Sequence, residues 1–390
     1  MPPFQDKTIL VVSPDFPYPP YHGGRVDIWG RLQSLKKLGF QIDLLATVRS
    51  RPSSADLRVV EKIVRSIRVI PRERNFWNAL GLRSFQMLSR NNLAKLDLLT
   101  VYDLVLLEGM YVLPILENPS LNGRCIILKM HNDEAVYNLE LARSSRNQFM
   151  RAFHFLEYLR FRRENLALPR RVNTIFFSSD SECLSFRERF PTIHSVYLGG
   201  ALADERIFSR SRQGMKVLFS GSLFMANNRE AISWYLDEVH ERLFDIDGYE
   251  FTVVGRTDNV PAAWLSSLKS QPRVSVHENV PSLDPFYEQA SVFVNPMRHG
   301  TSIKMKTIEA LRNGLPIVSS SCGAMGDRFE SGRQLIIADE GDAFAKAVRQ
   351  LLSDRDLSDR IVNNGFRFIE ENYNHAEKLE KLIAARLSVS

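Results

Sequence analysis

The sequence predicts an α/β protein built from two Rossmann-like, doubly wound domains that face a central cleft. Short apolar, β-branched runs alternate with longer helical patterns, which is typical of a doubly wound parallel sheet. A second set of such runs begins afresh at Lys216, after a stretch that lacks sustained periodicity. The length of 390 residues exceeds one typical hydrophobic core, so two domains are expected. Ligands of such folds bind beyond the carboxyl ends of the strands, and we expect the site there.

The first half of the chain carries six expected strands, each a run of apolar and β-branched residues. An amphipathic helix is expected at Arg25–Leu38, where Gly39 ends it. The expected strands are Ile9–Ser13, Gln41–Ala46, Arg68–Ile70, Leu104–Glu108, Cys125–Met130 and Thr174–Ser178.

The second half repeats this alternation. Its expected strands are Lys216–Gly221, Glu250–Gly255, Arg273–His277, Val292–Asn295, Pro316–Ser320 and Leu335–Ala338. Its expected helices are Asn228–Phe244, Leu283–Gln289, Ile303–Asn313 and Gly341–Ser353.

The two halves meet in Leu198–Gly214, a segment rich in Gly, Ser, Arg and Asp that we interpret as a linker. A last helical pattern runs from about Arg355 to Leu387 and is long enough to leave the second domain and brace the first. The expected organisation is therefore an N-terminal domain over residues 1–200, a linker over 201–214, a C-terminal domain over 215–365 and a C-terminal helix over 366–390.

Composition excludes several classes of protein. Hydrophobic residues make up 44% and charged residues 25%, which are ordinary globular values. No apolar run reaches the roughly 18 residues of a transmembrane helix. Met1–Lys7 is polar and leads straight into the strand-like Thr8–Val12, so a cleaved export signal is not expected. Cys125, Cys183 and Cys322 have neither metal-site spacing nor an even count, which fits reduced thiols. We expect a cytoplasmic protein without a metal site.

The net charge of +6 points to an anionic partner. The sequence contains no zinc-finger spacing, no aromatic-glycine RNA motif and no basic zipper, so nucleic acid is not expected. A diphosphate-bearing ligand or an anionic membrane surface is the expected partner. A mildly basic, solvated surface is the alternative.

The stretch from Asn295 to Leu311 is the most informative for chemistry. A buried strand is expected to end at Asn295, and after a short loop a helix is expected to begin near Ser302. Gly300 lets the backbone approach a ligand closely, and the first helical N–H groups, at Thr301 and Ser302, present partial positive charge. This arrangement predicts a phosphate site.

Three charged residues follow in the same helix. Lys304 and Lys306 are expected in its first turns, where two cations oppose the helix dipole unless an anion lies there. Glu309, about two turns in, is expected to reach the vicinal hydroxyls of a ribose. The alternative is an ordinary strand–helix unit with exposed lysines.

This stretch resembles the donor-site signature of retaining glycosyltransferases of the GT-B fold, family 4, in the variant Gly-x-x-Ile-Lys-x-Lys-x-x-Glu-Ala. Four further motifs resemble that family in the same order, over most of residues 216–340. They are Gly221-Ser222-Leu223 followed by Asn227-Asn228, the strand Phe251–Gly255, the segment Pro285–Val294, and Gly314-Leu315-Pro316-Ile317-Val318. The resemblance implies that Ser222, Asn228, Gly255 and Glu309 bind the donor.

The first half resembles the family less closely. Asp15-Phe16-Pro17 followed by Gly23 and Gly24 resembles its glycine-rich loop, which faces the donor diphosphate; a plain turn is the alternative. His131-Asn132-Asp133-Glu134 resembles its His-Asn-x-Glu, whose histidine touches the transferred sugar. A structural histidine at a strand end is the alternative for His131.

One departure from the family concerns position 301. Many relatives carry a second glutamate there, eight residues before the one matched by Glu309, where this chain has Thr301. We interpret the change as altered contacts to the donor sugar. The basic pair that other members place after the Gly-Ser loop is also absent, so phosphate neutralisation is expected from Lys304 and Lys306, with a contribution from Arg256.

The resemblance implies a hexosyltransferase-type enzyme that retains anomeric configuration and needs neither a metal nor a cofactor beyond its nucleotide-diphosphate sugar. The implied acceptor is a carbohydrate or lipid-linked hydroxyl, in surface polysaccharide or glycolipid assembly. Two alternatives share the fold: a nucleotide-sugar 2-epimerase, and a non-catalytic nucleotide-sugar-binding subunit in which Thr301 marks decay of the site.

Two segments interleave arginines with aromatic residues. In Arg65–Arg90 the basic residues alternate with Phe76, Trp77, Leu80 and Phe85, and Arg143–Arg171 has the same character. Such a surface suits peripheral contact with an anionic membrane, here the inner face of the cytoplasmic membrane. A helix with an apolar core face and a solvated basic face is the alternative.

Overall fold

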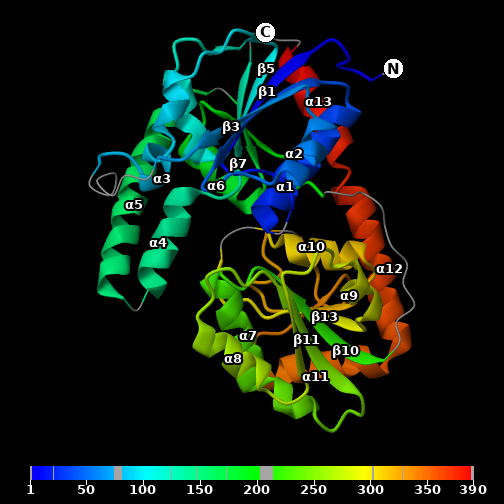
Figure 1. Ribbon diagram of the computed structural model, residues 1–390. Coiled ribbons are helices and arrows are strands. Elements are labelled where there is room, and N and C mark those ends of the chain that lie inside the picture. The colour runs from blue at the N-terminus through cyan, green and yellow to red at the C-terminus, as the bar shows by residue number, and fades with distance from the viewer. Residues whose placement is uncertain are drawn as a thin grey trace. The chain divides into compact units, whose positions relative to one another are not determined.

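The chain forms two compact units, which are described separately (Figure 1). Unit 1 comprises residues 1–20, 24–203 and 375–390, and unit 2 comprises residues 21–23 and 204–374. The computed structural model describes residues 2–20, 22–73, 81–123, 125–145, 147–172, 174–202, 214–300, 303–326 and 328–387. Most of the expected linker therefore lies outside the described residues.

Unit 1 contains a seven-stranded parallel sheet in the order β3-β2-β1-β5-β7-β8-β9. All six strands expected in the first half are present, and β9 is an addition. The strand order reverses between β1 and β5, where a doubly wound sheet leaves a crevice at its carboxyl edge. The strands are β1 Thr8–Ser13, β2 Gln41–Val48, β3 Ser66–Pro71, β5 Leu104–Glu108, β7 Ile126–Met130, β8 Thr174–Phe177 and β9 His194–Tyr197.

Helices cover this sheet, and several begin at a side chain that caps their first free N–H groups. Asp133 accepts from the Ala135 N–H, Asn147 accepts from the Phe149 and Met150 N–H groups, and Ser179 accepts from Glu182. The helices are α1 Gly23–Lys37, α2 Ser54–Glu61, α3 Phe85–Leu88, α4 Glu134–Ser144, α5 Gln148–Ala167, α6 Asp180–Arg189 and α13 His375–Leu387. Smaller elements are the 3-10 helices Asn91–Lys95, Met110–Glu117 and Leu168–Arg170 and the paired strands β4 Val101–Tyr102 and β6 Asn122–Gly123.

Unit 2 contains a six-stranded parallel sheet in the order β12-β11-β10-β13-β14-β15. All six strands expected in the second half are present. They are β10 Met215–Ser220, β11 Tyr249–Gly255, β12 Val274–Glu278, β13 Val292–Asn295, β14 Ile317–Ser319 and β15 Ile336–Ile337. The helices are α7 Ala226–Glu238, α8 Ala262–Lys269, α9 Asp284–Gln289, α10 Met305–Arg312, α11 Gly341–Ser353 and α12 Arg355–Asn372, with the 3-10 helix His240–Leu243.

The expected single helix from Arg355 to Leu387 is wrong, because the chain forms two. Tyr373 ends α12: its side chain is buried and its N–H donates to the Ile369 carbonyl. Helix α13 then starts at His375, which is buried in unit 1. The helix that joins unit 1 therefore starts at 375 and not at 366.

Helix α13 completes the core of unit 1 on one face of the sheet. Leu379 and Ile383 are both buried, and they belong to the same hydrophobic cluster as Ile9, Val11 and Leu35. Segments from the two ends of the chain thus share one core.

The basic segment Arg65–Arg90 is not one helix. It contains β3 and α3, and its residues 74–80, including Phe76, Trp77 and Leu80, lie outside the described residues. Among the described residues, no helix combines the length and the apolarity that a membrane crossing requires.

The role of α13 gives a testable expectation. Leu379→Ala removes a fully buried side chain and leaves a cavity, so the unfolding free energy of unit 1 should fall by about 2–5 kcal/mol. Hydrogen exchange should show faster exchange at the β1 and β2 amides. The control is Lys381→Ala on the exposed side of the same helix, with an expected change below about 0.5 kcal/mol. Equal effects of the two substitutions would contradict this role.

Candidate functional site

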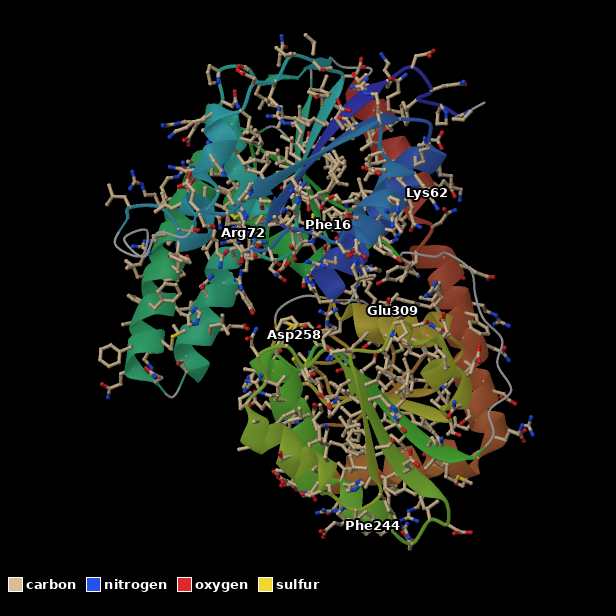
Figure 2. All side chains as sticks on the ribbon, viewed as in Figure 1. Phe16, Lys62, Arg72, Phe244, Asp258 and Glu309 are labelled. Carbon is tan, nitrogen blue, oxygen red and sulfur yellow. The ribbon has the colours of Figure 1, made fainter. Side chains whose placement is uncertain are left out.

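The sequence-predicted donor residues of unit 2 lie at the carboxyl ends of its parallel strands. Figure 2 shows Asp258 and Glu309 at one end of the unit and Phe244 at the other. Phe244 precedes β11 and Asp258 follows it, so the end with Glu309 is the carboxyl end of the sheet. This is the edge where doubly wound sheets bind ligands.

Lys306, in the first turn of α10, is the centre of this site. Its Nζ donates a hydrogen bond of 2.6 Å to Oδ1 of Asn228, the residue near the start of α7. The same Nζ lies 4.2 Å from the centre of the Phe219 ring and 4.0 Å from the Met297 sulfur. Asn228 is oriented by its own amide, which donates to the Ser222 carbonyl at 2.9 Å. Lys306, Asn228 and Ser222, all predicted from the sequence, are therefore brought together.

The environment of Lys306 disfavours its charge. Burial, and next the repulsion of Lys304, lower the pKa of Lys306 from 10.5 to about 7. No ion pair to Lys306 occurs within the part of the chain that the structure describes; its polar contacts are a neutral amide and a ring face. An anion at this position would favour the charged form and raise the pKa again.

Two glycines make room for this arrangement. A Cβ added to Gly221 would lie 2.9 Å from Lys306 Nζ and 3.0 Å from the Asn228 amide. A Cβ added to Gly255 would lie 1.8 Å from the Gly221 carbonyl oxygen. Gly255 thus lets the end of β11 approach the loop after β10, and Gly221 lets that loop pass beside Lys306. Gly221 was not predicted as a site residue, although it begins the Gly-Ser motif.

A buried hydrogen-bond network fixes the start of α10 against the end of β13. The Asn295 amide donates to Thr307 Oγ1 at 2.8 Å and to the Gly323 carbonyl at 3.0 Å. Thr307 also donates to Gly323, and Ser320 donates to the Met297 carbonyl. All these groups are buried, so their hydrogen bonds hold one geometry firmly.

The expected start of the helix near Ser302 is wrong. Helix α10 begins at Met305, and Lys304 is its N-cap residue, without a side-chain cap. The backbone of Gly326 packs against Ile303, where an added Cβ would lie 2.5 Å from the Ile303 Cα, and this packing holds Ile303 outside the helix. Thr301 and Ser302 lie outside the described residues.

Gly300 does have a backbone that favours glycine, with a φ of 145°. The Lys304 ammonium lies over it: a Cβ on Gly300 would be 2.7 Å from Lys304 Nζ. Gly300 and Lys304 are thus close together, and Lys304 lies near enough to Lys306 to lower its pKa.

Glu309 and Arg256 have different surroundings. Burial, with a smaller opposing effect of Arg312, raises the pKa of Glu309 to about 7. Asp284 adds repulsion in the same direction as burial. Arg256 follows β11 and pairs with Asp258 at 2.8–2.9 Å on the surface. Asp258 therefore already neutralises the charge of Arg256.

In unit 1, His131 follows β7 and lies within a buried ionic cluster. Its Nδ1 is 3.0 Å from Asp27, and its Nε2 is 3.2 Å from Glu108. Burial disfavours the imidazolium, but Asp27 and Glu108 outweigh burial and raise the pKa of His131. Its side chain is 19% exposed, so one face stays accessible.

The remaining members of this cluster were missed at the sequence level. The buried Arg31 donates to Glu108 at 2.6 Å and to Asp27 at 2.5 Å, and its Nη1 is 3.2 Å from His375 of α13. Burial lowers the pKa of Lys129, which donates to Ser178, to about 7. A signal was available, because Lys129 interrupts an apolar strand and Asp27 and Arg31 are spaced i, i+4 in a helix.

This ionic cluster does not indicate a metal centre. Asp27, Glu108 and His131 offer ligand atoms within 4.8 Å of one another. The Arg31 guanidinium already binds both carboxylates and supplies the positive charge.

Gly24, the second glycine of the loop after β1, lies in α1 of unit 1, whereas Gly23 is grouped with unit 2.

Comparisons with known proteins agree with this geometry. Residues 214–354 match the family model described as glycosyl transferases group 1. The chain is 30% identical over 387 residues to an uncharacterized 44.6 kDa protein in the cps region of Klebsiella pneumoniae, covering 94% of this chain and 96% of that protein.

Solved structures show the fold. Sucrose-phosphate synthase from Thermosynechococcus elongatus superposes with a TM-score of 0.68 at 14% identity, covering 98% of this chain and 100% of that one. HepE of Anabaena in complex with UDP-glucose superposes with a TM-score of 0.66 at 12% identity, with coverages of 98% and 100%. The fold is GT-B, with two Rossmann-like domains, as predicted.

The close approach at Gly255 is testable. Gly255→Ala should lower the opening free energy of the β10 and β11 amides in hydrogen exchange by about 3 kcal/mol or more, because the added Cβ meets a backbone carbonyl. Gly332→Ala is the matched control: its φ is 82° and it has open space, so only the backbone cost of about 1–2 kcal/mol is expected. An equal or smaller cost at Gly255 would show that the two loops are not held in contact.

Proposed function

Since the chain belongs to the group 1 glycosyltransferase family, we propose that it moves a sugar from a nucleoside-diphosphate sugar to an acceptor hydroxyl, with retention of anomeric configuration. The observation that carries the proposal is the environment of Lys306. Lys306 is a cation in a mostly apolar position at the carboxyl edge of the family-matched domain, and the residues described around it give it an amide and a ring face but no carboxylate. A diphosphate supplies the missing charge.

The proposed chemistry needs a stabilised leaving group. As the bond between the sugar and the phosphate breaks, negative charge grows on the diphosphate, so cations placed there favour the transition state over the intact donor. Lys306 and Lys304 take this role, and no divalent ion is required for it. Glu309 binds the ribose hydroxyls, and His131 contacts the transferred sugar.

Retention follows from attack on the same face of the sugar. The leaving phosphate oxygen takes the proton of the acceptor hydroxyl as the new glycosidic bond forms, so no protein nucleophile is needed. Water must be excluded during this step, because it would compete with the acceptor.

The setting we propose is the assembly of a surface polysaccharide or glycolipid on a lipid-linked acceptor. The Klebsiella relative lies in a cps region. HepE has been captured with UDP-glucose, which makes uridine nucleotide sugars the first donors to test.

We propose that the hairpin of α4 and α5, which lie side by side in Figure 1, contacts an anionic membrane surface. On α5 the side chains of Phe155, Leu159 and Leu166 are 49%, 43% and 64% exposed, although they are apolar. Arg162 and Arg163 are exposed on the same helix. The hairpin therefore combines apolar and basic groups, as interfacial helices do.

The acidic residues of α5 do not offset this charge, because both point inward. Glu157 pairs with Arg160 at 2.8 Å and accepts from the Phe85 N–H, and Glu164 pairs with Arg83 at 3.0 Å. A groove of about 720 Å³ between the two helices is lined by Leu139, Ala142, Arg143, Gln148, Arg151, Ala152 and Phe155. We propose that acidic phospholipids cover this face.

The donor site is tested with a panel of nucleotide sugars, by thermal stabilisation and by turnover in EDTA. At least one donor should be turned over without a divalent ion. Lys306→Met should lower kcat/KM for it by about 100-fold or more, with KM rising far less.

Because the pKa of Lys306 is about 7, the contribution of this residue to donor turnover should depend on pH. A diphosphate raises the pKa of Lys306, so the wild-type protein must take up a proton on binding above pH 7. The kcat/KM of the wild-type protein should fall by up to tenfold per pH unit above that value, and the fall should be absent in Lys306→Met. Lys346→Met, which removes an exposed lysine on α11, is the control. Full activity of Lys306→Met, or activity abolished by EDTA and restored by magnesium, would refute the proposal.

The membrane surface is tested by flotation with vesicles. The protein should bind vesicles that contain anionic phosphatidylglycerol and release them at high salt. Arg162→Gln with Arg163→Gln should weaken binding by about 10-fold or more, since each basic residue near the surface contributes about 1 kcal/mol. Phe155→Ser with Leu159→Ser should also weaken binding.

Leu184→Ser is the control, because Leu184 is 48% exposed on α6, which is not part of the hairpin. Two results would contradict membrane docking. One is equal binding to neutral vesicles; the other is a dimer of the free protein that Phe155→Ser dissolves, which would assign the face to a second copy of the chain.

A further inference from the structure

Four arginines gather at the carboxyl ends of β1, β2 and β3 in unit 1. Arg49 and Arg72 directly follow β2 and β3, Arg25 lies in the first turns of α1, and Arg90 follows α3. Figure 2 shows Arg72 at the same end of this unit as Phe16, which follows β1. Among the described residues, Asp15 is the carboxylate whose charge attracts Arg72 and Arg90.

This carboxylate is already engaged. Arg25 binds both oxygens of Asp15, at 2.9 Å through Nε and 3.1 Å through Nη2. The Phe16 N–H also donates to Oδ1 of Asp15, at 2.9 Å, so most of the roughly four acceptor sites of this carboxylate are used. Arg72 Nη2 is 3.7 Å from Asp15, too far for a hydrogen bond.

The arginines instead converge on a single backbone carbonyl, that of Pro14. It accepts from Thr47 Oγ1 at 2.9 Å, from Arg90 Nη2 at 2.9 Å and from Arg72 Nη2. A carbonyl oxygen has two lone pairs, so three donors exceed what it can fully satisfy. The Pro14 carbonyl therefore has more donors than it can satisfy.

Arg72 carries most of this imbalance. Its side chain is only 12% exposed, and its buried Nε has no hydrogen-bond partner among the residues that the structure describes. Arg90, by contrast, is satisfied, with Nε on Thr47 at 2.9 Å and Nη1 on the Gln86 carbonyl at 2.6 Å. Burial, together with repulsion from Arg49 and Arg25 against the attraction of Asp15, lowers the pKa of Arg72. A negatively charged group beside Arg72 would give its Nε an acceptor, and it would also compensate for the burial and repulsion that lower the pKa of Arg72.

We propose that Arg72 and Arg49 bind an oxyanion of the acceptor, a phosphate or a carboxylate, at the carboxyl edge of the unit 1 sheet. The inference rests on the proposed function in naming the acceptor as the source. The donor diphosphate is already assigned to Lys306 in unit 2, and the fork of an arginine matches a phosphate or carboxylate group. The enzyme therefore selects an acidic acceptor, with Arg72 as a specificity-determining residue.

The test titrates the full-length protein by calorimetry with inorganic phosphate, pyrophosphate and glucuronate, which separate phosphate from carboxylate recognition. Binding of at least one probe should weaken at least tenfold in Arg72→Gln and in Arg49→Gln. Arg49 is exposed, so its variant keeps the test usable where Arg72→Gln does not fold. Arg72→Lys, which keeps the charge without the fork, should recover part of the affinity.

Arg68→Gln is the matched control, because Arg68 lies on β3, donates to the Asp97 carbonyl at 2.7 Å and carries the same charge. It should leave probe binding unchanged. Loss of probe binding in Lys306→Met, with Arg72→Gln and Arg49→Gln unaffected, would move the anion site to unit 2 and overturn the inference. Unaltered binding in folded Arg72→Gln and Arg49→Gln would overturn it as well.

The two proposals fail separately. Probe binding that depends on Arg72, in a protein that binds and turns over no nucleotide sugar, would keep the anion site and refute the glycosyltransferase activity. Normal donor turnover with Arg72→Gln unaffected toward acidic and neutral acceptors would keep the activity and refute the acceptor site.

Discussion

The structure of unit 1 depends on one buried cation, Arg31. Its guanidinium binds Asp27 of the same helix and Glu108 at the end of β5, and it contacts His375 of α13. Removing it would leave two buried carboxylates unpaired, an effect that costs about 3–5 kcal/mol in proteins. The same carboxylates orient His131, which is therefore held by a charge network that spans almost the whole chain.

Two buried cations, Arg31 of unit 1 and Lys306 of unit 2, have opposite surroundings. Arg31 has two carboxylates, which compensate for the loss of water around it. Lys306 has an amide and an aromatic ring, among the residues that the structure describes, and the pKa of its ammonium falls accordingly. A compensated charge is structural, whereas an uncompensated one favours binding of a ligand that completes it. This difference separates Lys306 from Arg31.

The sequence allowed the sheets to be predicted well and the long-range contacts poorly. Strands such as β10 and β13 are continuous apolar runs between turn residues, which is a local signal. Strand β9 was missed because His194–Tyr197 is short and half polar. The start of α10 was misplaced because the packing of Gly326 on Ile303 is tertiary. The donor motif placed Lys306 and Asn228 together correctly, but the partners of His131, Asp27 and Glu108, come from other elements, α1 and the end of β5, and no spacing reveals them.

The shared core of α13 and β1 also has a consequence for the order of folding on the ribosome. Domains generally fold as units during synthesis, from the N-terminus onward. Here residues 24–203 are made first, yet Leu379 and Ile383, which complete their core, emerge only after all of unit 2. The second unit in the sequence can finish folding while the first still has an open apolar face. The nascent chain must protect that face for as long as about 170 further residues take to be translated.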